Sequence, residues 1–154
     1  MELSDIIGVE GIRAPLRSTG KKRLLQDIAD LADSVYGLPA DEVFKALTER
    51  EALGPTGVGR GVAIPHARFP GVTRVIGLFV RLEKAVDFES IDRQPVDLVF
   101  ALFAPEAAGA EHLKALARVS RTLRSEAVCA KLRSTFDPSA LFSILMEGRA
   151  EEAA

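Results

Sequence analysis

The chain contains 154 residues, of which 47% are hydrophobic and 27% are charged, and its formal net charge is −2. This length and composition are typical of one globular domain with a sizeable buried core, and they exclude a disordered or fibrous chain. The near-neutral balance lacks the basic excess of a nucleic-acid-binding protein, so we expect no nucleic-acid partner.

The N-terminal third is predicted to be helical. Residues 21–37 combine a helical apolar period with a terminating glycine, Gly37, and Ser18 or Thr19 is the expected N-cap. A second helix is expected over residues 40–53, and Gly54 ends it. The apolar positions are Leu24, Ile28, Leu31 and Val35 in the first helix and Val43, Phe44, Leu47 and Leu53 in the second.

The middle of the chain has the composition of β-strands. Residues 72–82 and 95–105 are nearly continuous runs of β-branched and apolar side chains, which is typical of strands buried on both faces. Residues 61–66 favour a shorter strand. Pro65 marks the end or an edge of that strand, because proline lacks the backbone donor that a sheet requires.

The C-terminal third returns to helical spacing. Helices are expected over residues 110–125, 128–132 and 137–147, the last with Asp137 as N-cap and Pro138 in the first turn. The apolar stripe of the first of these is Leu113, Leu116, Val119 and Leu123. Helices around a strand-rich centre predict an α/β fold, a single-domain three-layer sandwich with a mixed β-sheet flanked by α-helices on both faces. No linker or repeat divides the chain, so residues 1–154 are expected to form one domain, with about 148–154 as a flexible tail.

Cysteine content and hydropathy bear on the compartment. The single cysteine, Cys129, cannot form an internal disulfide, which favours a reducing compartment, and it resembles a small apolar helix residue. No apolar run approaches the roughly 20 residues needed to span a bilayer. The first residues include acidic side chains and lack the basic start and apolar block of a signal peptide. We therefore expect a cytoplasmic protein with no direct membrane insertion.

A glycine-rich turn, GPTGVGRG at residues 54–61, approaches the phosphate-binding pattern of nucleotide-binding proteins. Arg60 stands where that pattern has lysine, and Gly61 stands where it has the hydroxyl residue that binds magnesium. The turn also follows a predicted helix and leads into a strand, which is the reverse of the order in a nucleotide-binding loop. We interpret it as a segment in which the backbone turns tightly.

The two histidines of the chain are the candidate reactive groups. His66 follows Pro65 at a predicted strand end beside a loop, where a neutral imidazole can act as nucleophile, base or ligand. From its spacing alone, a surface or partly buried histidine without a reactive role is the simpler interpretation. His112 lies at one end of the apolar stripe of its helix and is expected to face inward, and spacing alone favours a packed residue at the edge of the core.

Other site types find little support in the sequence. It has no H-x-x-x-H or C-x-x-C spacing, so we expect no metal. It has no G-x-S-x-G motif, although a Ser-His-Asp arrangement is not excluded by spacing. We expect no cofactor.

The segment LTEREALGPTGVGRGVAIPHAR, residues 47–68, resembles the active-site segment of the type-2 IIA domains of the bacterial phosphoenolpyruvate-dependent sugar phosphotransferase system. The pattern of that family is an Arg-Glu pair that closes a helix, a Thr-Gly loop and then Ala-[Ile/Val]-Pro-His. Here these motifs are Arg50-Glu51, Thr56-Gly57 and Ala63-Ile64-Pro65-His66. The resemblance extends through residues 86–105 and 111–123 and so covers most of the chain. Within the family, residues 21–32 and the absence of fused transport domains are most similar to the nitrogen-type regulatory branch.

The resemblance implies a phosphotransferase chemistry for these residues. His66 would accept a phosphoryl group from a phosphohistidine on an HPr-type phosphocarrier protein, provided that its other ring nitrogen is held protonated. Arg50 matches the active-site arginine of the family, whose guanidinium can contact two phosphoryl oxygens. His112 matches the second active-site histidine, which would donate to the phosphoryl group rather than carry it. Further implied partners are regulatory target proteins or a separate IIB component.

The sequence departs from the pattern of the family at two positions, and two alternative functions stay open. Arg60 stands where family members commonly have a small polar residue, and Ala67 stands where glycine is common. Arg60 would add a second positive charge near the phosphoryl group or change the partner preference. The chain could instead be a fructose- or mannitol-type IIA component of sugar uptake. It could also be a non-catalytic regulatory binding module of the same fold, although a pure scaffold has no need for Arg50, His66 and His112 together.

Overall fold

The computed structural model describes the backbone of residues 1–153 and the side chains of residues 1–147. Within this part of the chain, a six-stranded sheet has the order β1-β5-β6-β3-β2, with β4 also paired to β6. The strands are β1 (Ile12–Leu16), β2 (Gly57–Gly59), β3 (Val62–Ala63), β4 (His66–Arg68), β5 (Ile76–Val86) and β6 (Val96–Ala104). The sheet is mixed, because β5 and β6 are antiparallel whereas β3 and β4 run parallel to β6.

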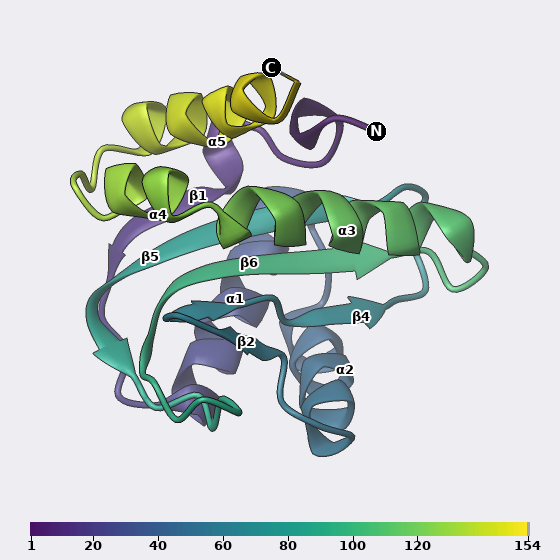
Figure 1. Ribbon diagram of the computed structural model, residues 1–154. Coiled ribbons are helices and arrows are strands. Elements are labelled where there is room, and N and C mark those ends of the chain that lie inside the picture. The colour runs from purple at the N-terminus through teal and green to yellow at the C-terminus, as the bar shows by residue number, and fades with distance from the viewer. Residues whose placement is uncertain (154) are drawn as a thin grey trace.

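Helices cover both faces of this sheet, as Figure 1 shows. The helices α1 (Lys21–Tyr36) and α2 (Ala40–Ala52) pack on one face. The helices α3 (Ala110–Arg124), α4 (Glu126–Leu132) and α5 (Pro138–Ala153) pack on the other, together with the short 3-10 turns Leu3–Asp5 and Val9–Gly11. The predicted α/β three-layer sandwich is confirmed.

The central strand β6 contributes to both layers of the core. Successive side chains of a strand point to opposite faces. Val99, Ala101 and Phe103 accordingly pack toward α1 and α2, and Leu98, Phe100 and Leu102 pack toward the other three helices. All six are fully buried. This double burial explains why the sequence of β6 is apolar at successive positions instead of alternating.

Two helix boundaries follow the predicted signals, whereas α4 begins at Glu126, two residues before its expected start. Gly37 adopts the left-handed conformation, with φ of 70°, and ends α1, as expected. Asp137 caps α5, since its Oδ2 accepts a hydrogen bond from the amide of Ala140 at 3.0 Å. The prediction of Ser18 or Thr19 as the N-cap of α1 is wrong. Gly20 occupies that position and makes no side-chain cap.

Three further expectations are corrected by the structure. Strand β1 was not predicted, because it is short, contains Pro15 and alternates in burial at the edge of the sheet. Leu53 is 85% exposed, since α2 ends one residue before it. Leu113 is 68% exposed, because the buried face of α3 passes through His112, Ala115 and Val119.

Two further expectations concern the C-terminal tail and membrane insertion. The predicted flexible tail at residues 148–154 lies outside the residues whose side chains are described, so it stays a prediction. Among the described residues, none of the helices is long and apolar enough to cross a membrane.

Candidate functional site

His66 is the first residue of β4, and its ring is held by the backbone immediately before it. Ala67 packs into the core on the side of α1 and α2, so the alternation of the strand turns His66 toward the side of α3. The Nδ1 atom of His66 lies 2.8 Å from the carbonyl oxygen of Ile64. Because a carbonyl only accepts hydrogen bonds, Nδ1 carries the proton and Nε2 keeps its lone pair. The half-buried ring therefore has a defined tautomer, with an available lone pair on Nε2.

His112 lies in the first turn of α3 and is 7% exposed, so the expectation that it faces inward is confirmed. Its ring centroid is 5.5 Å from that of His66, and the two rings meet edge to face at 75°. The Nε2 atom of His112 is buried and has no hydrogen-bond partner in the structure. A buried polar atom without a partner is unfavourable, so this nitrogen is suited to a ligand that arrives beside His66.

The surroundings keep both imidazoles neutral at pH 7. Burial lowers the pKa of His66 below its ordinary value of 6.5, and the positive charge of Arg50 lowers it further, while the Ile64 carbonyl and Glu51 oppose these effects. Burial also lowers the pKa of His112, with additional contributions from His66 and Arg68. A neutral ring is the form that offers a lone pair.

Arg50 enters the site from the last turn of α2, on the opposite side of the sheet from α3. Its Nη1 donates to the carbonyl oxygen of Gly54 at 2.9 Å, which ties the side chain to the loop after the helix. A guanidinium has five N–H donors, so this contact leaves others for an anionic ligand. The structure thus brings Arg50, His66 and His112 into one neighbourhood.

A buried carboxylate lies directly behind this neighbourhood. The side chain of Glu51 is 6% exposed, and its Oε2 lies 2.8 Å from Nζ of Lys21. The same oxygen accepts the amide of Thr56 at 3.1 Å, and Oε1 accepts the hydroxyl of Thr56. The Arg-Glu and Thr-Gly motifs pointed to these residues, but nothing in their spacing predicts the contact with Lys21, which lies on another helix.

The glycine-rich turn forms a small β-hairpin. Residues of β2 pair antiparallel with β3, and Arg60 and Gly61 connect the strands with φ of 58° and 81°. Arg133 fixes the turn by donating to the carbonyl of Arg60 and to the carboxylate of Asp97. The Arg60 side chain extends to the carbonyl of Arg124 and to Glu126, at the junction of α3 and α4. The hypothesis that Arg60 adds charge at the phosphoryl group therefore gains no support.

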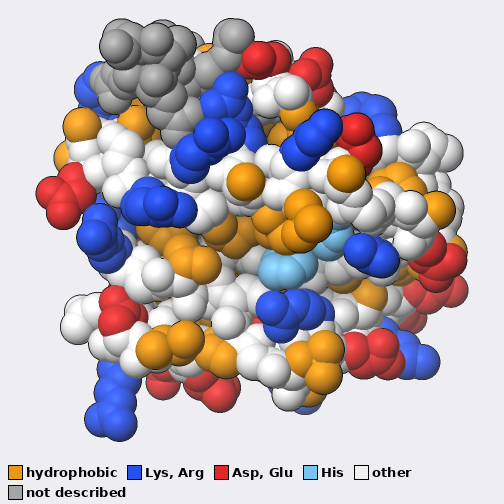
Figure 2. Space-filling model, turned by 45° about the vertical axis from the view of Figure 1, so that its right-hand side comes forward, with side chains coloured by type: hydrophobic (Ala, Val, Ile, Leu, Met, Phe, Trp, Pro, Cys, Tyr) orange, Lys and Arg blue, Asp and Glu red, His pale blue; other side chains and the backbone are white. Residues whose placement is uncertain are grey.

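The two histidines reach the surface in a shallow region bordered by basic and hydrophobic side chains (Figure 2). Three exposed apolar side chains belong to the elements that carry the site. Leu53 follows α2, Val58 lies on β2 and is 59% exposed, and Leu113 is adjacent to His112 on α3. A patch of exposed apolar side chains is typical of a protein-docking surface, and Figure 2 shows hydrophobic side chains beside the histidine pair.

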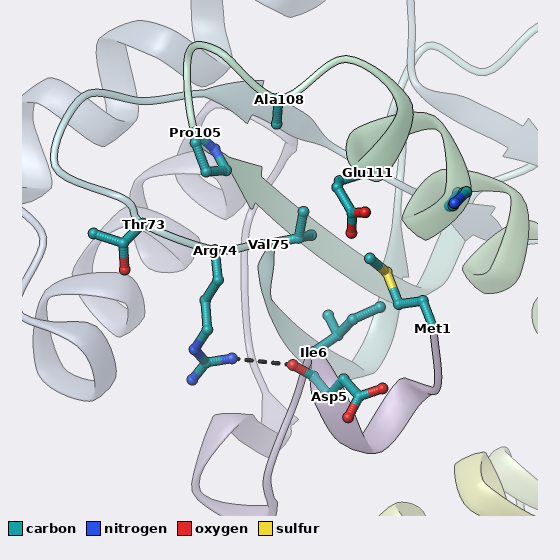
Figure 3. Close-up of a pocket in the computed structure, with 10 residues that line it drawn as sticks. Met1, Asp5, Ile6, Thr73, Arg74, Val75, Pro105, Ala108 and Glu111 are labelled. Atoms are coloured by element: carbon teal, nitrogen blue, oxygen red, sulfur yellow. Dashed lines mark hydrogen bonds between the residues drawn. The ribbon is translucent and has the colours of Figure 1, made fainter.

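A cavity of about 540 Å³ lies apart from the histidine pair, between the N-terminal segment, the residues before β5 and the start of α3. Figure 3 shows its apolar floor and its charged rim, where Arg74 donates to the carbonyl oxygen of Asp5 at 3.0 Å. Its lining contains neither histidine nor Arg50, so it is not the site of their chemistry.

Neither metal binding nor thiol reactivity is supported by the described side chains. Residues 1–147 contain no group of three or more His, Cys, Asp or Glu side chains that could hold a metal ion. Cys129 is buried, its Sγ donates to the carbonyl of Leu123, and burial raises the pKa of its thiol. A buried thiol with a raised pKa is unreactive, which agrees with its interpretation as a packing residue.

Comparison with known proteins identifies the family. The family model described as phosphoenolpyruvate-dependent sugar phosphotransferase system, EIIA 2, matches residues 5–148. The chain belongs to this family, whose members are phosphotransfer components, and the resemblance inferred from its motifs is confirmed.

Individual relatives are regulatory and sugar-specific proteins. The chain is 48% identical over 145 residues to the nitrogen regulatory protein of Bradyrhizobium diazoefficiens, covering 94% of this chain and 95% of that protein. The crystal structure of nitrogen regulatory protein IIA-Ntr from Neisseria meningitidis matches with a TM-score of 0.87 and 34% identity, over 93% of this chain and 98% of that one. The fructose-specific EIIABC component of Bacillus subtilis is 32% identical over 94% of this chain and 23% of its own length.

Proposed function

We propose that this protein is a nitrogen-branch regulatory IIA phosphocarrier that accepts a phosphoryl group on Nε2 of His66. The donor is a phosphohistidine on an HPr-type carrier. The Nε2 lone pair forms the new N–P bond while the N–P bond of the donor breaks, and the donor imidazole keeps that electron pair. The observation that carries the proposal is the hydrogen bond between His66 Nδ1 and the Ile64 carbonyl, which leaves Nε2 free as the nucleophile.

Arg50 and His112 are proposed to stabilise the transferred group. Phosphoryl transfer spreads negative charge over three equatorial oxygens, and preorganised donors stabilise that charge. Arg50 supports this role through its guanidinium, which is already fixed by Gly54. His112 supports it through a buried Nε2 that lacks a partner and would gain one from a phosphoryl oxygen. A phosphoryl dianion beside His112 would also favour the protonated form of that ring.

The exposed apolar residues Leu53, Val58 and Leu113 are proposed to receive the donor carrier. All three are exposed and lie on or directly after α2, β2 and α3, so a partner that docks on these elements also reaches His66. The region also carries arginines, among them Arg50 and Arg68, whose charges act on the two histidines. This charge suits a phosphorylated donor better than a strongly basic one.

Sugar uptake is the second candidate function, and it rests on the similarity to the fructose-specific protein of Bacillus subtilis. The higher identity to the nitrogen regulatory protein of Bradyrhizobium diazoefficiens favours the regulatory role. In either case, a IIB component or regulatory targets would be the next partners. A purely non-catalytic module is disfavoured by the coexistence of a free nucleophilic nitrogen, an anchored arginine and an unpartnered buried imidazole.

The test is reconstitution with purified components. The protein is incubated with labelled phosphoenolpyruvate, the first enzyme of the system and either an HPr-type carrier or its nitrogen-branch counterpart. We expect one phosphoryl group on His66, and faster transfer from the nitrogen-branch carrier. The label should be lost in acid and kept in alkali, as phosphohistidine is. An acid-stable label, or none with either carrier, contradicts the proposal.

A further inference from the structure

We propose that Lys21, Glu51 and Thr56 form a positioning relay that fixes the tautomer of His66. This inference rests on the proposed function of His66 as the phosphoryl acceptor. None of the three side chains is assigned to touch the phosphoryl group. They act through the backbone of the segment that carries the nucleophile.

Glu51 is the hub of the relay. Its side chain is 6% exposed, and burial of a charge is costly unless the charge is paired and hydrogen-bonded. Lys21 supplies the opposite charge, and both the amide and the hydroxyl of Thr56 donate to the carboxylate oxygens. The carboxylate oxygens of Glu51 thus hold the start of α1, the end of α2 and the Thr56 loop together. Removal of any one partner leaves a buried charge incompletely compensated.

The second half of the relay is a backbone path from Thr56 to the imidazole. The carbonyl oxygen of Thr56 accepts the amide of Ile64 at 2.9 Å. The carbonyl oxygen of the same Ile64 lies 2.8 Å from Nδ1 of His66. The peptide units on both sides of Ile64 are therefore tied, one to Thr56 and one to the nucleophile. A shift of the Thr56 loop would move the acceptor that holds the proton on Nδ1.

The location of Lys21 supports a role beyond helix stability. Lys21 is the first residue of α1, where the positive end of the helix dipole disfavours a cation. Its side chain is nonetheless 15% exposed, with Nζ on Glu51 and also 4.8 Å from the ring centroid of Phe88. Lys22, the next residue, is exposed instead. A partly buried lysine paired with Glu51 at an unfavourable helix position indicates that the pairing itself is what this residue provides.

The relay has a consequence for the chemistry. If the Ile64 carbonyl is displaced, the proton can move to Nε2, and the lone pair then points away from the donor phosphorus. Attack requires the reactive tautomer and a correct approach, and misplacement by about 1 Å can cost on the order of a hundredfold in rate. Glu51 also acts on His66 through space, since its negative charge opposes the lowering of the His66 pKa.

The test compares Glu51→Gln and Thr56→Val with the wild type by two measurements. Ring ¹⁵N shifts of His66 report the tautomer in the unphosphorylated protein. Single-turnover transfer from the phosphorylated carrier reports the rate. We expect a larger share of the Nε2–H tautomer in both variants and a rate at least about tenfold lower. Thr56→Ser, which keeps the hydroxyl, should behave as the wild type.

Matched controls separate positioning from a general loss of stability. Glu49→Gln removes an exposed charge from the same turn of α2. Asp27→Asn breaks the ion pair between Asp27 and Arg23 on α1, the helix that carries Lys21. The Asp27 side chain is 12% exposed, so this control also removes a largely buried charge. Both should leave the tautomer unchanged. An equal tautomer shift in Asp27→Asn overturns the relay.

The outcomes distinguish this inference from the proposed function. The tautomer is measured without any phosphoryl donor, so a wild type that accepts no label contradicts the proposed function alone. A labelled wild type together with wild-type tautomer and rate in Thr56→Val overturns the relay alone. If Glu51→Gln does not fold, Thr56→Val decides, since it keeps the backbone and the volume of the side chain.

Discussion

The β5–β6 pair and the segment from Arg50 to His66 are held by different kinds of interaction. Strands β5 and β6 pair along their length and bury apolar side chains on both faces, so water exclusion fixes them. The Arg50–His66 segment runs from the last turn of α2 through the short strands β2 and β3 to the start of β4, and polar contacts tie it to Lys21 and Arg133, which are distant in the chain. Stability and reactivity should therefore be separable here, because apolar burial builds the scaffold whereas hydrogen bonds orient the proposed nucleophile, His66.

Among the variants of the Arg50–His66 segment, His66→Ala should have the largest effect on function. We expect total loss of phosphoryl acceptance, because the variant lacks the Nε2 atom that is proposed to attack. The fold should remain, since His66 is half-buried and packs at the edge of the core. Labelling with the phosphorylated carrier measures the first effect, and circular dichroism measures the second. Label on His112 in this variant would show that the roles of the two histidines are reversed.

Phe100→Ala in β6 should have the opposite effect, lowering stability and leaving reactivity unchanged. Phe100 is fully buried, with its ring centroid 6.2 Å from that of Phe79. Its truncation should lower the free energy of unfolding by about 3–5 kcal/mol. Transfer to His66 should stay near the wild-type rate in the fraction that is folded. Urea unfolding measures the change, with Ile91→Ala, an 85% exposed side chain, as the control that should shift stability little. A loss of less than about 1 kcal/mol for Phe100→Ala would contradict this account of the core.

Arg50→Lys tests the Arg50–His66 segment more finely, because the substitution changes the shape of the side chain and keeps its positive charge. Lysine cannot contact two oxygens in the fixed geometry of a guanidinium, and it would also lose the contact with Gly54. We expect transfer about a hundredfold slower, the lower end for loss of one preorganised donor. Stability should change little. Single-turnover labelling at saturating carrier measures the rate, and a wild-type value would remove Arg50 from the site.

His112→Ala tests the supporting histidine. The variant should still be labelled at His66, about tenfold more slowly, which is the contribution of a hydrogen bond to a charged group. The buried Nε2 of His112 has no partner before transfer, so its removal costs no existing hydrogen bond. Labelling and stability measured on the same sample separate the two effects. Complete loss of label would mean that His112 carries the group or is needed to form the site.

The sequence predicted the scaffold better than the site, and particular elements show why. Helices α1, α2 and α3 and strands β5 and β6 are encoded by local apolar patterns, which are visible in the chain. Strand β1 is not, because its residues depend on pairing with β5 far along the chain. The contact between His66 and His112 depends on β4 lying beside β6, from which α3 departs. Family motifs indicated both residues, but no spacing rule places one ring against the other.

The polar contacts of Glu51 with Thr56 and Lys21 were also difficult to predict from the sequence. Glu51 and Thr56 are near each other in the chain, and their pairing could be suspected from the motif. Lys21 joins them only because α1 and α2 pack side by side on one face of the sheet. Polar side chains follow no periodicity that identifies their partners, so such contacts emerge from the three-dimensional structure.

The smallest expected effect is the pH dependence of the two histidines. Burial lowers the pKa of both below 6.5, so the folded protein binds fewer protons than the unfolded chain in the window just below that value. Stability rises with pH wherever the unfolded state binds more protons. The contribution is therefore complete above pH 6.5 and is lost as the pH falls below it, until the folded-state pKa values are reached. Phosphoryl acceptance should follow the folded-state pKa of His66, and so persist to lower pH than that of an exposed imidazole.

Two measurements check this prediction. Ring ¹³C shifts titrate each histidine in the folded protein, and urea unfolding at pH 7.5 and 5.5 gives the change in stability. Subtracting the same pair of values for a variant with His66→Gln and His112→Gln removes the part that comes from carboxylates such as Asp27, whose pKa is raised by burial. In His66→Gln alone, the pKa of His112 should rise, because the neighbouring charge that lowers it is gone, yet burial should keep it below 6.5. A His66 pKa at or above 6.5 would mean that the ring is more hydrated, or more strongly affected by the negative charge of Glu51, than its burial indicates.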